Sequence, residues 1–353
     1  MAQMDRYFRE ILTRGGSDLH LAQGQPPKMR QGGSIVRIDD RVLDGETIEG
    51  LLSEICDNDR WDRFVEKGDL DFAYALGEEA RFRANYYRHV QGIGGIFRII
   101  PKEILSIDDL KLPEVLRTFA DYPNGMVLVT GPTGSGKSTT LAAVIDHINR
   151  NYERHILTIE EPIEFVHPNR KSILVQREVG IDVGSFGRAL RDAGHSDVDV
   201  ILVGEMRDLE TISLAITAAE GGTLVFGTLH TNSAAKTIDR IIDVFPSDQQ
   251  SQVRTMLSES LKAVCSQLLL KRKSGGRIAA NEVLLQTTAL SNIIREGGGL
   301  NKLHSVMLSG KSIGMQIMDD VIEDYRSRGL VSGHEAYMKA LDKERFTAHR
   351  DEE

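Results

Sequence analysis

The sequence has only two cysteines and no long apolar run. Cys56 and Cys265 lie far apart, and neither belongs to a C-x-x-C pair, so the sequence predicts neither a disulfide framework nor a zinc site. No apolar run approaches the roughly 18 residues of a membrane span, and charges occur throughout residues 1–12. We therefore expect no transmembrane segment, no secretory signal and a cytoplasmic protein.

Basic residues are outnumbered by acidic ones. The chain has 43 lysines and arginines against 52 aspartates and glutamates, which gives a net charge of -9. A general nucleic-acid-binding protein needs a basic face to neutralise phosphates, so this balance argues against a nucleic-acid partner. The one compact basic run, at residues 271–273, is interpreted as a solvated loop.

The strongest functional signal is a complete G-x-x-x-x-G-K-S motif at residues 131–138. Its glycines let successive backbone N–H groups point at phosphate oxygens, while Lys137 and the Ser138 hydroxyl can reach the phosphates and a Mg²⁺ ion. An apolar run precedes the motif and an amphipathic helix pattern follows it, as the motif requires. The sequence therefore predicts a bound nucleoside triphosphate with its Mg²⁺ ion at Ser138. The predicted nucleotide-binding residues are Gly131, Pro132, Thr133, Gly134, Ser135, Gly136, Lys137, Ser138 and Thr139.

The pattern along the chain predicts an α/β protein with two domains. Residues 1–100 combine one amphipathic helix with short alternating segments, which is typical of a small α+β domain. Residues 101–124 contain three prolines, so we expect a linker with a short helix at 112–120. Residues 125–353 are expected to form the nucleotide-binding domain around a mostly parallel sheet, followed by a mostly helical region after about residue 245. Its expected strands are residues 126–130, 155–160, 172–176, 198–203 and 223–229.

Polar residues stand at the ends of three expected strands. In an open α/β sheet, ligands bind outside the carboxyl ends of the strands. Glu160 and Glu161 end one strand, Glu205 follows a second after a single glycine, and His230 follows a third. Phosphoryl transfer to water needs a group that orients and activates that water, and we predict that Glu205 is this group.

Two interpretations stay open for the other strand-end residues. Glu160 or Glu161 either contacts the Mg²⁺ shell through water or has a solvated turn role before Pro162. His230 either senses the γ-phosphate through a ring N–H or is structural.

Six stretches together resemble the type II/type IV secretion ATPase superfamily. The resemblance extends over residues 3–347, and within the superfamily it is strongest to motors that retract type IV pili and so produce twitching motility. It implies a homohexameric ring of ATPase subunits, each with an N-terminal PAS-like domain and a C-terminal RecA-like domain that ends in a helical region. The stretches are GSDLHL at 16–21, RFR at 81–83, GPTGSGKSTT at 131–140, IEEPIE at 159–164, GEMRD at 204–208 and GTLHTNSAA at 227–235.

The resemblance also implies roles and partners. By motif, the chain's residues match the Walker A motif, an acidic box, the Walker B glutamate and a histidine box. The partners implied are an inner-membrane platform protein of the pilus, which places the ATPase at the inner face of that membrane, and a paralogous retraction ATPase. Lys137 and Ser138 match the Walker A motif, Glu160, Glu161 and Glu164 match the acidic box, Glu205 matches the Walker B glutamate, and His230 lies in the histidine box.

The family places arginines of the N-terminal domain on the nucleotide phosphates, and Arg83 and Arg98 stand at the spacing seen in its members. An arginine supplied across a mobile domain boundary would stabilise the charge that develops on the γ-phosphate and tie chemistry to domain closure. The alternative is that both arginines line a sheet edge and pair with Asp69 or Asp71.

The chain departs from the family pattern in three places, and one of them, Glu161 where the family usually has an aspartate, preserves the charge. Residues 194–199 read GHSDVD and lack the family's arginine and proline, and Ser291 replaces the first arginine of a C-terminal segment linked to retraction. Two functions therefore stay open: the principal retraction motor, or an accessory paralogue or slow-turnover nucleotide-binding component of a mixed motor. The missing four-cysteine zinc element argues against a pilus extension motor. The acidic balance argues against a DNA-handling ATPase.

Overall fold

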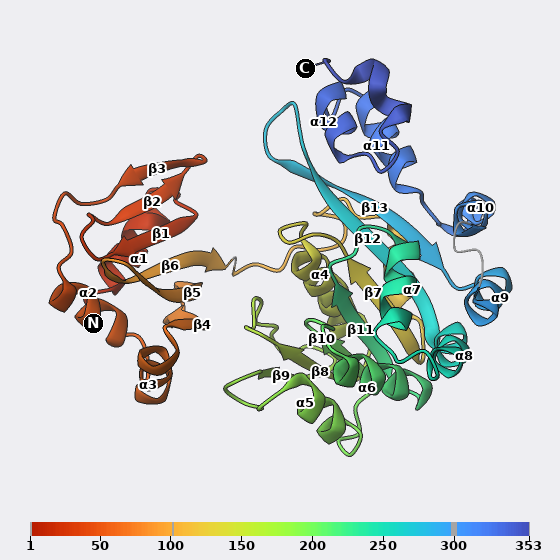
Figure 1. The fold of residues 1–353 in the computed structure, drawn as a ribbon, viewed down its shortest axis with the longest axis horizontal. Coiled ribbons are helices and arrows are strands. Elements are labelled where there is room, and N and C mark those ends of the chain that lie inside the picture. Colours follow the sequence, from red (N-terminus) through yellow and green to blue (C-terminus); the bar gives the residue numbers. More distant parts are fainter. Residues whose placement is uncertain (1, 101, 298–301, 353) are drawn as a thin grey trace. The chain divides into compact units, whose positions relative to one another are not determined.

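The computed structural model describes residues 2–100, 102–297 and 302–352. Contacts divide the chain into one unit of Met1–Glu103 with Pro162–Val166 and a second of Ile104–Glu161 with His167–Glu353 (Figure 1). Residue 101, where we expect the linker to begin, lies outside the described residues. Among the helices that the structure describes, none combines the length and apolar character needed to span a membrane.

The first unit is built on a six-stranded antiparallel sheet in the order β3-β2-β1-β6-β5-β4. The amphipathic helix near the N-terminus is confirmed, and its Phe8 ring stacks on Phe82 with centroids 4.2 Å apart, inside an aromatic core. The elements are α1 (Asp5–Thr13), β1 (Asp18–Ala22), β2 (Lys28–Gln31), β3 (Ser34–Arg37), α2 (Gly45–Ser53), α3 (Asn58–Lys67), β4 (Asp69–Leu76), β5 (Ala80–His89) and β6 (Gly92–Ile100).

The second unit contains a seven-stranded sheet in the order β13-β12-β7-β11-β10-β8-β9. All neighbouring strands run parallel except β13, which is an antiparallel edge strand. The strands β7, β10 and β11 are buried along their whole length, as expected of apolar strands covered on both faces. The five expected strands are confirmed, as β7 (Gly125–Thr130), β8 (His155–Glu160), β9 (Ile173–Glu178), β10 (Val200–Val203) and β11 (Leu224–Leu229).

Helices join most of these strands and continue to the C-terminus (Figure 1). The short helix expected at 112–120 is a 3₁₀ helix, η1 (Glu114–Ala120), whose Leu116 and Phe119 are buried in the core of this unit. The others are α4 (Lys137–Asn151), α5 (Phe186–Ala193), α6 (Leu209–Glu220), α7 (Ala234–Asp243), α8 (Gln250–Ser260), α9 (Thr288–Glu296), α10 (Leu303–Ser309), η3 (Lys311–Ile313), α11 (Met318–Ser327), α12 (Gly333–Lys339) and η4 (Glu344–His349).

The expectation of mostly helical structure after residue 245 is wrong for one long segment. The strands β12 (Leu261–Lys271) and β13 (Arg277–Leu285) form an antiparallel hairpin, and β12 adds to the parallel sheet beside β7. Periodicity does not distinguish a buried strand from a buried helix in such an apolar run, and pairing with β7 decides the outcome. The chain reverses at Gly275 and Gly276, whose φ angles of +85° and +76° favour glycine.

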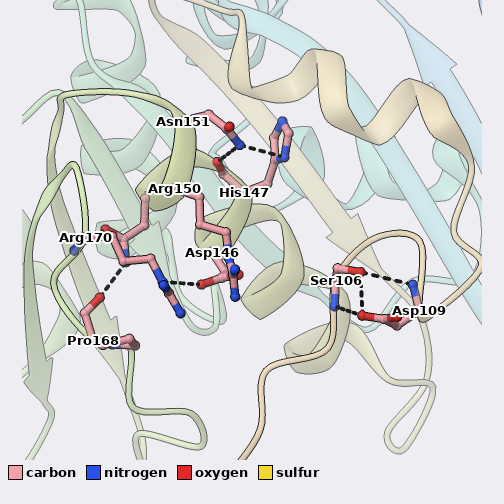
Figure 2. Close-up of polar contacts among 9 residues, drawn as sticks. Ser106, Asp109, Asp146, His147, Arg150, Asn151, Pro168 and Arg170 are labelled. Atoms are coloured by element: carbon pink, nitrogen blue, oxygen red, sulfur yellow. Dashed lines mark hydrogen bonds and ion pairs between the residues drawn. The ribbon is translucent and has the colours of Figure 1, made fainter.

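Polar side chains at the end of α4 hold the segment that leads to β9 (Figure 2). The Asn149 side chain donates a 2.7 Å hydrogen bond to the carbonyl of Pro168 and accepts one of 3.1 Å from the Arg170 N–H. The buried Asp146 carboxylate lies against both Arg150 and Arg170. These contacts tie the helix that follows the G-x-x-x-x-G-K-S motif to the edge of the sheet.

Beside this cluster, the buried His167 should make the stability of the second unit depend on pH. Burial lowers the pKa of its imidazole from 6.5 to about 4, against the opposing charge of Asp146. The unfolded chain therefore binds a proton between pH 6.5 and 4 that the folded chain does not, and the free energy of unfolding falls as the pH drops. The contribution is about 2 kcal/mol between pH 7 and pH 5. In His167→Leu, calorimetric unfolding at pH 7 and pH 5 should show a decrease in the free energy of unfolding that is smaller by this amount.

The matched control is His195→Leu, because the His195 side chain is exposed. This control should keep the pH dependence of the unchanged protein. If the free energy of unfolding falls equally between pH 7 and pH 5 in the unchanged protein and in His167→Leu, His167 does not cause the effect.

Candidate functional site

The loop between β7 and α4 has the backbone shape that a phosphate cradle needs. Gly131, Gly134 and Gly136 have φ angles of +147°, +78° and +86°, which residues other than glycine rarely adopt. A Cβ atom on Gly131 would lie 2.3 Å from the carbonyl oxygen of Gln267, so the loop has no room for a side chain there. The expected curl of the backbone is confirmed.

The side chains of this loop are arranged around that cradle. The Lys137 ammonium folds back and donates to the carbonyls of Gly131 at 2.8 Å and Pro132 at 3.2 Å. The Ser135 hydroxyl is buried and has no hydrogen-bond partner among the described residues. Ser138 lies in the first turn of α4, where the free N–H groups and the helix dipole favour an anion.

A second polar group lies after β10. The Glu205 carboxylate accepts a 2.5 Å hydrogen bond from the Arg207 guanidinium and lies 2.7 Å from Nε2 of His230. Burial acts to raise the pKa of Glu205, but the bonds from Arg207 and His230 outweigh it and hold the pKa below its usual range. The carboxylate is therefore ionised at neutral pH, and since it only accepts hydrogen bonds, Nε2 of His230 carries the proton.

Strand order brings these groups to one edge of the sheet. The strand β10 runs parallel to β11, which runs parallel to β7. Glu205, His230 and the loop at 131–136 follow the carboxyl ends of these three strands, as the sequence predicts. The Thr228 hydroxyl donates to the carbonyl of Gly204 at 2.5 Å and fixes the segment that carries Glu205 to the neighbouring strand.

The acidic pair at the end of β8 splits into two environments. Glu160 accepts hydrogen bonds from the Thr158 hydroxyl at 2.8 Å and from the Gln176 amide at 3.2 Å, so it faces β9. Glu161 is exposed, and its charge contributes to raising the pKa of Arg207 after the larger effect of Glu205. The roles of both glutamates remain predictions.

The two arginines with a predicted catalytic role lie opposite each other on β5 and β6 of the first unit. Arg83 lies 3.9 Å from Asp71, as the alternative interpretation expects, and 3.5 Å from Glu164. Arg98 pairs with the buried Asp18 at 2.8 Å. Both arginines lie on interior strands and not at a sheet edge, which corrects that part of the alternative. Their role on phosphates remains a prediction.

Sequence reasoning missed two residues of the second unit that contact the predicted site. Arg207 lies only two positions after Glu205, and a basic residue so close to the predicted water-activating group was the available signal. Gln267 contacts the phosphate loop from β12, and its signal was a polar residue inside a long apolar run.

A phosphate loop, a strand-end glutamate and a histidine on the carboxyl edge of a parallel sheet define the class of P-loop ATPases. Residues 102–320 match the family model described as type II/IV secretion system protein. The chain belongs to this family.

Individual relatives are similar over nearly the whole chain. The type IV pilus retraction ATPase PilT of Pseudomonas aeruginosa is 48% identical over 94% of this chain and 96% of its own length. The type IV pilus ATPase PilU of the same organism is 36% identical over 96% of this chain and 88% of its own length. A crystal structure of the pilus retraction motor PilT with bound ADP superposes with a TM-score of 0.90 at 41% identity, covering 98% of each chain.

Proposed function

We propose that this chain is the motor that powers retraction of type IV pili by hydrolysing ATP, and thereby twitching motility. The observation that carries the proposal is the 48% identity to PilT over nearly the full length of both chains. The geometry of the second unit supports it, because a phosphate loop, Glu205 and His230 share one edge of the sheet.

The residues of the loop fit a nucleotide with Mg²⁺. The glycine backbone leaves no room for a side chain at Gly131, and the buried Ser135 hydroxyl lacks a partner among the described residues. The N–H groups of the loop would hold the phosphates of ATP, and Lys137 would exchange its two carbonyl contacts for phosphate oxygens. Ser138 would hold the Mg²⁺ ion, which neutralises charge on the β- and γ-phosphates.

Glu205 would act on the attacking water. Its ionised carboxylate accepts a proton, while Arg207 and His230 hold its two oxygens in place. The Nε2–H of His230 would also suit a γ-phosphate oxygen, so His230 would exchange its bond to Glu205 for one to that phosphate and thereby report its presence. Glu160 and Glu161 would add negative charge near the metal shell.

The larger assembly extends this proposal. The first unit would be a PAS-like domain and the second a RecA-like domain, with Arg83 and Arg98 of the first supplying positive charge to the phosphates. Six copies would form a ring at the cytoplasmic face of the inner membrane and act on the pilus platform protein. The likeness to the solved PilT structure over both units supports this division.

Deleting the gene from the organism that encodes the chain should leave cells hyperpiliated and unable to move by twitching, because pili would assemble without being withdrawn. Pilus counts by electron microscopy and surface motility assays would measure both effects. Restoring the gene should restore both to normal. Cells without pili would instead indicate an assembly function, and normal motility would contradict the proposal.

An accessory or slow-turnover motor component is the second candidate. One observation favours it. In the divergent segment at 194–199, Asp197 has a φ of +47°, a conformation that the family's proline at position 198 would disfavour. The backbone of this segment therefore departs from the family pattern together with its sequence. The higher identity to PilT than to PilU favours the principal motor. The kcat for ATP of the purified chain alone separates the two.

A further inference from the structure

Gln267 lies buried in the middle of β12 and contacts the phosphate loop. Its side-chain amide donates a 2.6 Å hydrogen bond to the carbonyl oxygen of Ser135. Its side-chain oxygen accepts hydrogen bonds from the Thr140 hydroxyl at 2.7 Å and the Asn281 amide at 2.9 Å. One side chain thus joins the loop, the first turns of α4 and the hairpin partner β13.

Strand pairing puts Gln267 at this position. The last pair between β7 and β12 joins Thr130 to Ser266, so Gln267 lies one residue beyond it, beside Gly131 where β7 opens into the loop. Asn281 is directly opposite Gln267 in the hairpin. With both Asn281 and Thr140 donating to its oxygen, the Gln267 amide has one stable orientation, with its nitrogen toward Ser135.

We propose that Gln267 is a positioning residue that sets the direction of a phosphate-binding N–H group. The peptide bond is planar and trans, so the carbonyl of Ser135 and the N–H of Gly136 point in opposite directions. Holding the carbonyl toward β12 turns the Gly136 N–H away from β12 and into the loop. Gly136 is part of the motif whose N–H groups bind phosphate.

This inference rests on the proposed function, because it assumes that the loop binds nucleotide phosphates. It adds a residue outside the motif and assigns a role to the β12–β13 hairpin. Without Gln267, the Ser135 carbonyl would lose a buried donor, and the peptide between residues 135 and 136 would be free to rotate before each binding event.

The test compares ADP binding and ATP hydrolysis in full-length variants. In Gln267→Met, the methionine side chain has a similar length but neither the amide N–H nor the amide oxygen of glutamine. This variant should raise the Kd for a fluorescent ADP and the KM for ATP about tenfold. Thr140→Val keeps the bond to Ser135 and loses only one anchor of the amide. It should raise the Kd about threefold, a smaller effect in the same direction.

Leu270→Ala is the control for general destabilisation, because Leu270 is fully buried on the same strand but packs in a separate cluster with the C-terminal helices. It should lower the Tm and leave ADP affinity unchanged. ADP affinity at the original level in Gln267→Met overturns the inference, and so does an equal loss of affinity in Leu270→Ala. If Gln267→Met does not fold, unchanged affinity in Thr140→Val overturns it. An unchanged protein that binds no ADP overturns the proposed function itself.

Discussion

Replacing Lys137 with alanine should lower kcat/KM for ATP at least a hundredfold and weaken ADP binding with it. The Lys137 ammonium already lies over the loop, 2.8 Å from the carbonyl of Gly131, and supplies positive charge where the phosphates would bind. Removing one preorganised charge or donor from such a site costs about 10² to 10³ in rate. Phosphate release from ATP and titration with fluorescent ADP measure both effects.

Lys171→Ala is the matched control, since it removes an equal charge from an exposed position in the same unit. Its rate and affinity should stay close to those of the unchanged protein. Circular dichroism should show that Lys137→Ala is folded, because the hydrogen bonds that it loses to the carbonyls of Gly131 and Pro132 lie at the loop and not in the core. Hydrolysis by Lys137→Ala at the original rate would remove the loop from the mechanism.

Local patterns were sufficient for the phosphate loop and for most of the sheet. The glycines at 131, 134 and 136 have positive φ angles, as the motif predicts. This prediction was possible because all residues of the motif lie in one short segment of the sequence. Strands such as β7 and β11 lie within a residue of their expected bounds, because short apolar runs between turns have few alternatives in an α/β protein. Strand-end positions also put Glu205 and His230 at carboxyl ends of the sheet, and the structure brings the two side chains into contact.

Contacts between distant parts of the chain could not be predicted in this way. Gln267 reaches Ser135 and Thr140 across 132 and 127 residues of sequence. The position of Gln267 follows from β12 pairing with β7, and the apolar run of β12 gives no period that identifies it as a strand. Arg98 likewise meets Asp18 across 80 residues, a pairing that no local pattern favours over Asp69 or Asp71.

Changing Glu205 to glutamine should separate binding from chemistry. The amide has the size of the carboxylate, and its oxygen can still accept a hydrogen bond from Arg207, so ADP affinity should change by less than about threefold. The amide cannot take a proton from water. Loss of a general base lowers kcat by about 10² to 10⁴.

Glu210→Gln gives the control for this change, because Glu210 is an exposed carboxylate in the first turn of α6 that pairs with Arg191. It should hydrolyse ATP at the original rate. The opposite signatures of the two site variants are the informative part: Lys137→Ala should lose affinity and rate together, whereas Glu205→Gln should keep affinity and lose rate. If Glu205→Gln retains its kcat, the carboxylate that His230 and Arg207 hold does not activate water, and the base lies elsewhere on this edge of the sheet.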